Sequence, residues 1–146
     1  MKKVLLAAVF VAVSNAALAQ GTPAPEDAAV YFVNLENGAT VTSPVKVIFG
    51  LTGMGIAPAG MERDSTGHHH LLLNRPPLGE GELGAEEFET VVPADDNHLH
   101  FGGGQTETVL ELPPGDHTLQ LVFGDASHIP HANPVKSEVI TITVTE

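Results

Sequence analysis

Eight histidines lie between residues 68 and 131 of this 146-residue chain, and none precedes them. They occur in four groups, which are His68-His69-His70, His98 with His100, His117, and His128 with His131. Neutral imidazole is the commonest protein ligand for zinc, copper and nickel, and it is also the side chain whose unperturbed charge changes between pH 5 and 8. The histidines therefore predict metal chemistry or a pH response, provided that the groups meet in space.

Two of the groups have a spacing that suits a shared ion. In a β-strand, residues i and i+2 face the same side, so His68 with His70, and His98 with His100, each present two imidazoles in one direction. The middle residue, His69, faces the other side with the leucines that follow it. We therefore expect His69 to pack against the interior or to support the ligands, and we regard it as a less certain ligand.

A third group lies in a segment rich in turn-forming residues. His128 and His131 belong to the sequence GDASHIPHANP, in which Pro130 and Pro134 restrict the backbone. A stiffened loop holds its side chains in fewer positions, which favours a preformed site. We expect both rings to contribute to the same site as the other two groups.

Other polar or soft donors accompany the histidines. Asp125, and Asp95 with Asp96, are placed in sequence to accept hydrogen bonds from the ring nitrogens that do not bind the ion, which is the usual surrounding of a His-ligated metal. Met54 and Met61 lie in the long connection before the first histidines. Thioethers favour Cu(I), but a methionine in a Gly-rich loop is more often a packing residue, so both interpretations stay open.

The elements that must position these residues are short β-strands. Seven β-favouring runs are separated by Gly, Pro and Asn signals, and they span residues 29–35, 45–51, 68–74, 88–92, 106–112, 117–123 and 138–144. In the sixth run Leu119, Leu121 and Phe123 alternate with other residues, as in a strand with one buried face. This pattern is typical of an all-β fold, a single immunoglobulin-like β-sandwich of about seven antiparallel strands.

The direction of the strands places the histidine groups. Successive antiparallel strands reverse direction, so the connections after the second, fourth and sixth runs lie at one end of the sandwich. All the histidines except His117 lie in or next to these connections. We therefore expect those seven histidines to gather at that end. His117 lies at the opposite end, in the sequence LPPGDHTL, where an aromatic side chain of such sandwiches hydrogen-bonds to the upstream backbone.

The beginning of the chain resembles an export signal. Two lysines, a short apolar run and the small-residue sequence Ala17-Leu18-Ala19 predict a secretory signal peptide at residues 1–19. We expect a flexible leader at residues 20–28 and the β-sandwich domain at residues 29–146. The protein is then periplasmic or secreted. Since no other segment approaches the roughly 18 to 20 apolar residues of a membrane span, we expect no membrane insertion.

Composition excludes several classes of function. The formal net charge is −12, and removal of the two lysines of the signal peptide makes it more negative, so nucleic acid is a poor partner. The chain has no cysteine, which excludes thiolate catalysis, Cys-ligated zinc, iron–sulfur clusters and blue-copper centres. The run Gly102-Gly103-Gly104 lacks the lysine and the helix of a phosphate loop. We expect it to let the backbone pass close to its neighbours.

Four motifs carry a resemblance to a known family. They are STGHHHLLL (residues 65–73), HFGGGQTE (100–107), LPPGDHTLQL (112–121) and GDASHIPH (124–131). Together they resemble a family of small exported bacterial proteins catalogued as a domain of unknown function, and the resemblance extends from Val30 to Val144. It implies an exported, single-domain β-protein and brings no biochemical role with it. His98 lies outside these motifs, so we rank His100 above it.

These observations favour an exported, histidine-rich protein that binds, transfers or buffers copper or zinc. The expected ligands are His68, His70, His100, His128 and His131, with His69 and His98 less certain. If several neutral imidazoles lie together, acidification forces like charges onto one another and protons compete with the metal. Metal affinity should then fall between pH 8 and pH 5.

Two alternatives stay open. The protein can be a non-catalytic interaction or ligand-binding module whose histidines form a structural hydrogen-bond network without metal. It can also be a metal-dependent enzyme with an open coordination position. The enzyme is the less favoured of the two, because no carboxylate is clearly placed in the sequence as a general base.

Overall fold

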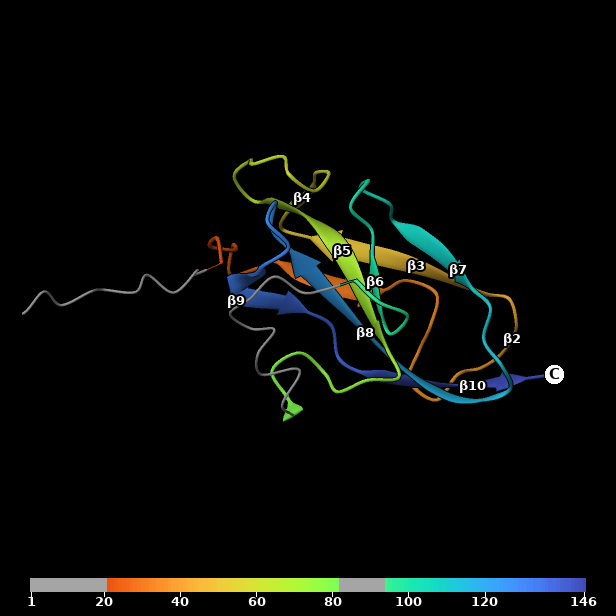
Figure 1. The fold of residues 1–146 in the computed structure, drawn as a ribbon. Helices are drawn as coiled ribbons and strands as arrows, with labels where there is room; N and C mark the ends of the chain where they lie inside the picture. The colour runs from red at the N-terminus through yellow and green to blue at the C-terminus, as the bar shows by residue number, and fades with distance from the viewer. Residues whose placement is uncertain (1–20, 82–93) are drawn as a thin grey trace, which may run out of the picture.

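The structure is a computed structural model, and it describes residues 21–81 and 94–146. The regular elements within these ranges are ten β-strands (Figure 1). They are β1 (Ala29–Phe32), β2 (Thr40–Thr42), β3 (Val45–Thr52), β4 (Gly55–Ile56), β5 (Thr66–Leu73), β6 (His98–His100), β7 (Glu107–Leu110), β8 (Gly115–Gly124), β9 (Pro130–Lys136) and β10 (Ile140–Thr145). The predicted all-β class is therefore confirmed.

The strands form two sheets. The smaller has the order β1-β3-β7, and the larger has the order β2-β10-β8-β5-β4, with β6 also paired to β5 and β9 to β8. Most neighbours are antiparallel, but β2 pairs with β10 and β4 pairs with β5 in parallel. The prediction of purely antiparallel strands is therefore wrong. The two parallel pairs involve strands of three and two residues, which are too short for side-chain alternation to reveal them.

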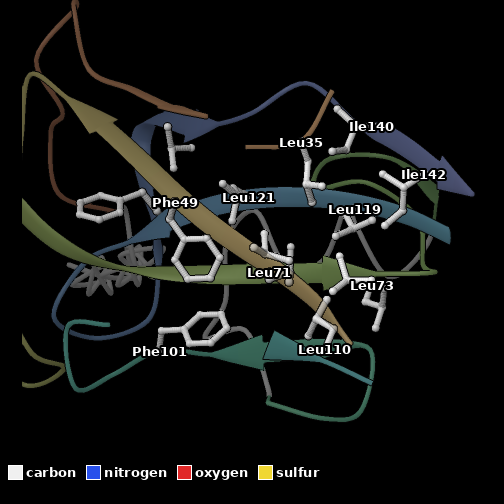
Figure 2. Packing of buried hydrophobic residues seen from close by; sticks show 14 of the residues in the cluster. Leu35, Phe49, Leu71, Leu73, Phe101, Leu110, Leu119, Leu121, Ile140 and Ile142 are labelled. Carbon is white, nitrogen blue, oxygen red and sulfur yellow. The ribbon is translucent and has the colours of Figure 1, made fainter. Parts of the chain in front are cut away.

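The two sheets enclose one main hydrophobic core. Figure 2 shows Phe49 of β3 and Phe101 facing Leu71 and Leu121 of the larger sheet. The two phenylalanine rings lie 4.8 Å apart between centroids, and Leu71 and Leu121 are fully buried. Full burial of one such side chain stabilises the fold by about 1.5–3 kcal/mol. The alternation predicted for residues 117–123 therefore does place one face of that run in the core.

Six of the seven predicted runs correspond to strands, namely β1, β3, β5, β7, β8 and β10. The predicted run at residues 88–92 and the predicted signal peptide at residues 1–19 lie outside the described residues. Within the described residues, no helix has the length and apolar character needed to cross a membrane.

Two strands that position histidines were not predicted. His98 and His100 were expected in a connection, but they belong to β6, which pairs with β5. His131 was expected in a loop, but it belongs to β9, which pairs with β8 despite Pro130 and Pro134. Proline is compatible with a strand that needs few ladder hydrogen bonds, such as one at a sheet edge. Pairing with distant partners, and not local propensity, decides both strands.

The described part of the predicted leader contacts the sandwich. The Thr22 carbonyl accepts a hydrogen bond from the Ala132 backbone N–H at 3.0 Å, and Ala24 is buried in the core cluster. The Thr22 hydroxyl also lies 2.9 Å from His131 Nδ1. Residues 21–24 therefore lie against β9, a contact that their composition did not indicate.

His117 forms the structural corner that the sequence predicts. Its Nε2–H donates to the Pro113 carbonyl at 2.9 Å, so Nδ1 accepts from the Asn74 side-chain amide at 2.9 Å. The Asn74 side-chain oxygen in turn accepts the Thr118 backbone N–H at 3.0 Å. Both ring nitrogens are satisfied, which leaves none for an ion.

Replacement of His117 tests this role. H117A should lower the free energy of unfolding in urea by about 1–3 kcal/mol, because it leaves the Pro113 carbonyl and the Asn74 amide without their partner. N74G suits the φ of 53° at that position and removes the same hydrogen bond from the other side. The H117A/N74G double variant should be less destabilised than the sum of the single variants. Full additivity, or a loss below about 0.5 kcal/mol for H117A, contradicts the assignment.

Candidate metal centre

Strand β5 carries the histidine run and is buried on both faces. Successive residues of a strand point to opposite faces. His69 and Leu71 face the main core, where His69 lies between the rings of Phe49 and Phe123, with centroids 5.1 Å from each. His68 and His70 face the other side together with Leu72, which belongs to a second, smaller apolar cluster. All three histidines of the run are at most 1% exposed.

Strand β6 brings two more histidines to the same outer face. It is antiparallel to β5, with His100 opposite His70 and His98 opposite Leu72. Directly opposite residues of a ladder have side chains on the same face, about 4.5–5.5 Å apart at Cβ. The ring centroid of His70 lies 5.1 Å from that of His100 and 5.0 Å from that of His98. The two predicted His-x-His pairs therefore meet through a strand pairing.

Three of these residues can share a metal ion. His68, His70 and His100 each have one nitrogen within 4.8 Å of a nitrogen of both others. His68 Nε2 and His70 Nε2 lie 3.1 Å apart. Two imidazoles bound at about 2.0–2.1 Å in tetrahedral geometry have their ligand nitrogens roughly 3.3 Å apart, so this pair has nearly the separation of two ligands of one ion.

His98 contacts His70 on the side away from His68. Its Nε2 lies 2.9 Å from His70 Nδ1, a hydrogen-bond distance in which one nitrogen must carry the proton. With the proton on His70 Nδ1, His70 Nε2 keeps its lone pair and faces His68. A ligating histidine usually donates its other N–H in this way. In that tautomer, His98 holds His70 as a ligand through Nε2.

His128 comes to the group from the connection between β8 and β9. Its ring centroid lies 4.6 Å from that of His100, 5.0 Å from that of His68 and 6.2 Å from that of His70. Its backbone has a φ of 66°, in the left-handed region that non-glycine residues seldom adopt. The chain thus accepts a strained backbone that brings this imidazole to the other three.

Asp125 fixes the loop that carries His128. One carboxylate oxygen accepts the backbone N–H groups of Ser127 and Ile129, at 2.8 and 3.1 Å. Its other oxygen has contacts of 3.4 Å to the Thr22 backbone N–H and hydroxyl. The expectation that Asp125 accepts a ring N–H is therefore not supported by its hydrogen bonds. The carboxylate shapes the turn through these hydrogen bonds, and its charge acts on His68 and His131 by raising their pKa values against the effect of burial.

His131 lies apart from the histidine cluster. Its Nδ1 contacts the Thr22 hydroxyl and carbonyl at 2.9 and 3.1 Å, and its ring stacks on Phe123 with centroids 6.1 Å apart. The structure therefore places His131 against the N-terminal segment and the core, and not beside His68, His70 and His100. Its strand pairs with the other side of β8 from β5, which separates it from the site.

The remaining predicted donors do not join the group. The Asp95 carboxylate accepts the Asn97 backbone N–H at 2.7 Å, and Asp96 is exposed. Met54 is partly buried and packs against the main core. Met61 is 55% exposed. The described site is therefore built from imidazole nitrogen.

Two glycines pack against ring nitrogens of the cluster. A Cβ on Gly102 would lie 2.6 Å from His100 Nε2, and a Cβ on Gly124 would lie 2.8 Å from His70 Nε2. Neither glycine has a positive φ, so the need for glycine there is steric. The close backbone passage expected for the run Gly102-Gly103-Gly104 is confirmed at Gly102. Gly124 was missed, since a glycine at the end of a strand carries no special signal.

Burial keeps these imidazoles neutral. It is the main cause that lowers the pKa of His68 and of His69 to about 4. His70, which also faces His98 and His68, has its pKa lowered well below the usual value by burial and then by those neighbours. Burial, followed by the proximity of His128, lowers the pKa of His100. Neutral imidazole is the form that binds metal.

The metal-free protein should lose stability as the pH falls below 7. An unfolded histidine with a pKa near 6.5 takes up a proton that its folded counterpart refuses, so stability is complete above about pH 6.5 and declines toward pH 4. His68 and His69 should each cost at most about 2 kcal/mol at pH 5. Urea unfolding in the presence of a chelator at pH 7, 6 and 5 measures the decline.

His69 supplies a control for this decline, because it titrates but lies on the core face. H69L should reduce the loss of stability between pH 7 and pH 5, since one buried imidazole is gone. Stability that is constant or rises on acidification, in wild type, contradicts the electrostatic account.

Comparisons with known proteins place the chain in a family. No curated protein matches it. Among solved structures, the endo-β-1,4-mannanase from Thermotoga petrophila aligns over 82% of this chain and 20% of its own, with 15% sequence identity and a TM-score of 0.46. This chain thus spans about a fifth of that enzyme, and a likeness of this size indicates nothing about the function of this chain. The DUF4399 profile matches residues 47–145. Since that is more than half of the sequence, the chain belongs to the DUF4399 family, a domain of unknown function.

Proposed function

We propose that this protein is an exported metal-binding protein that holds copper(II) or zinc and serves its binding, transfer or buffering. The observation that carries the proposal is the group His68, His70 and His100, whose ligand nitrogens lie within 4.8 Å of one another. The predicted signal peptide supports a periplasmic or secreted location. We also propose that the two sheets have an immunoglobulin-like topology.

The donor set supports this choice of metals. Imidazole suits zinc and copper, and a site of imidazoles without carboxylate ligands disfavours magnesium and calcium, which take oxygen ligands. His100 Nε2 is buried and has no hydrogen-bond partner in the described structure. His69 and His131 also have buried nitrogens of this kind outside the cluster, so the feature supports the site only together with the short distances among His68, His70 and His100. An ion at this point gives His100 Nε2 a partner.

A second candidate function has its own support. His70 has a nitrogen of His98 at 2.9 Å on one side and a nitrogen of His68 at 3.1 Å on the other. Both distances allow hydrogen bonds, so the cluster can also be a structural network in a metal-free binding module. In that case copper and zinc leave the melting temperature unchanged. A binding ion at 100 times its Kd stabilises the folded state by about 2.7 kcal/mol.

Calorimetric titration of tag-free mature protein with Cu²⁺ and Zn²⁺ tests the proposal directly. Wild type should bind one ion with a Kd below about 10 μM, which corresponds to about −7 kcal/mol. H70Q keeps a polar side chain of similar size but removes the central imidazole, and it should weaken binding at least 100-fold. H131Q removes a histidine outside the cluster and should bind as wild type does. Equal binding by H70Q and wild type, or no binding by wild type, refutes the proposed site.

Substitution of a glycine tests the site without touching a ligand. G102A places a methyl group against His100 Nε2 and forces that ring to shift. Metal binding should weaken about 10-fold or more, which is the effect of other changes that disturb the orientation of a ligand. G103A is the matched control. A Cβ there meets only the flexible end of the Gln105 side chain, at 3.2 Å. The same affinity for both variants contradicts the assignment of His100 Nε2 to the site.

A further inference from the structure

We propose that His128 is a displaceable fourth ligand, which closes the coordination position through which an incoming nitrogen donor takes over the metal. The inference rests on the proposed metal-binding function and adds to it the step by which the ion leaves. Three histidines hold the ion from the sheet, and the fourth approaches from a loop. The distinction matters, because four protein ligands close a zinc site and three leave a position open.

The cluster has a rigid half and an accessible half. His68 and His70 lie within β5 and are at most 1% exposed. His70 pairs with His100 of β6 on one side and with Val122 of β8 on the other, and His68 pairs with Gly124 of β8. His128 is partly exposed and lies in the connection between β8 and β9. His100 at the end of β6 is also partly exposed, and its ring lies 4.6 Å from that of His128, so an external ligand reaches the ion from the side that these two residues share.

His128 also differs in the positions of its nitrogens. Its ring contacts the rings of His68, His70 and His100, yet the residues whose ligand atoms lie mutually within 4.8 Å are those three alone among the described ones. The three sheet histidines are thus set for an ion before it binds. His128 lies beside them and must turn its ring to complete the coordination.

The backbone of the loop stays in place during such a turn. Asp125 accepts two backbone N–H groups of the loop, its own N–H donates to the Ile129 carbonyl at 2.9 Å, and the His128 N–H donates to the Asp125 carbonyl at 3.0 Å. The Gly60 N–H donates to the Ala126 carbonyl at 2.9 Å and ties the loop to the segment before β5. The movement that opens the site is therefore a rotation of the His128 side chain.

The surroundings of the loop favour a neutral donor over an anion. A cleft of about 700 Å³ adjoins the loop, and its walls include Asp125, Glu62 and Asp64, with Arg63 as the cation among the lining residues. Three carboxylates against one guanidinium disfavour an anionic ligand. A neutral imidazole of a partner protein meets no such repulsion. Imidazole is the commonest neutral metal ligand in proteins and suits zinc and copper, so we expect the incoming ligand to be an imidazole nitrogen.

Cobalt(II) spectroscopy of the mature protein tests the proposal, because the visible spectrum of bound cobalt depends on the number and the type of its ligands. H128G removes the imidazole and suits the φ of 66° at that position, so the loop keeps its form. Cobalt-loaded H128G should have a shifted visible spectrum, because water replaces the imidazole in the fourth position, and free imidazole should restore the wild-type spectrum. The rate of cobalt transfer to a chelator should rise at least about 10-fold in H128G. Loss of an outer-shell partner already weakens metal binding by about 10-fold or more, and loss of a direct ligand should weaken it no less. S127A, an exposed change in the same loop, should behave as wild type.

The outcomes separate the two proposals. If wild type and H70Q both fail to bind cobalt or zinc, the metal site and the displaceable ligand are both refuted. If wild type binds, H70Q does not, and H128G has the wild-type spectrum and transfer rate, then the site stands and the role of His128 is refuted. A changed H128G spectrum that imidazole does not restore also refutes it, because loop damage and not ligand loss then explains the change.

Discussion

The burial of strand β5 on both faces is the constraint on which the candidate site depends. A strand has only two faces, so three consecutive histidines cannot all point the same way. The core face takes His69, which packs between Phe49 and Phe123. The outer face takes His68 and His70, which stand side by side two residues apart. Pairing with β6 then adds His100 at the neighbouring position on that same face.

Enclosure of these rings has an electrostatic consequence that suits a ligand cluster. Burial disfavours the charged imidazole, and each neighbouring histidine adds to the penalty by like-charge repulsion. The rings of His68, His69, His70 and His100 are therefore held in the neutral form, which is the form that binds metal. If His70 Nδ1 donates the hydrogen bond between His70 and His98, then Nε2 of His70 is the nitrogen that offers its lone pair. Packing and protonation thus favour the same arrangement.

Local pattern predicts much of the fold, and pairing decides the rest. The alternation of Leu119, Leu121 and Phe123 identifies β8 because one face of that strand is apolar. No local signal identifies β6, since His98–His100 is only three residues long and is a strand through its pairing with β5. The parallel neighbours β2 and β4 escape prediction for the same reason.

The candidate site follows the same division. The spacing correctly places His68 with His70, and His98 with His100, on one side of their own strand, because i and i+2 spacing in a strand is a local property. The pairing of β5 with β6 then brings the two pairs to the same face. His131 shows the limit of this reasoning. It is only three residues from His128, but the chain enters β9 at Pro130 and carries the ring to Thr22 and Phe123. Which side of a sheet a residue reaches after a turn depends on contacts that sequence proximity does not reveal.

The pairing of His70 with His100 has one more consequence for a protein without cysteine. An ion held by both residues would close a covalent-like loop of about 30 residues, and a bond to His128 would close a second loop of similar length. Cross-links of this size restrict the unfolded chain and stabilise a fold by about 3–4 kcal/mol in entropic models of disulfides. The histidine cluster would thus give this sandwich the cross-link that exported domains usually obtain from oxidised cysteines, and a chelator would act on it as a reductant acts on them.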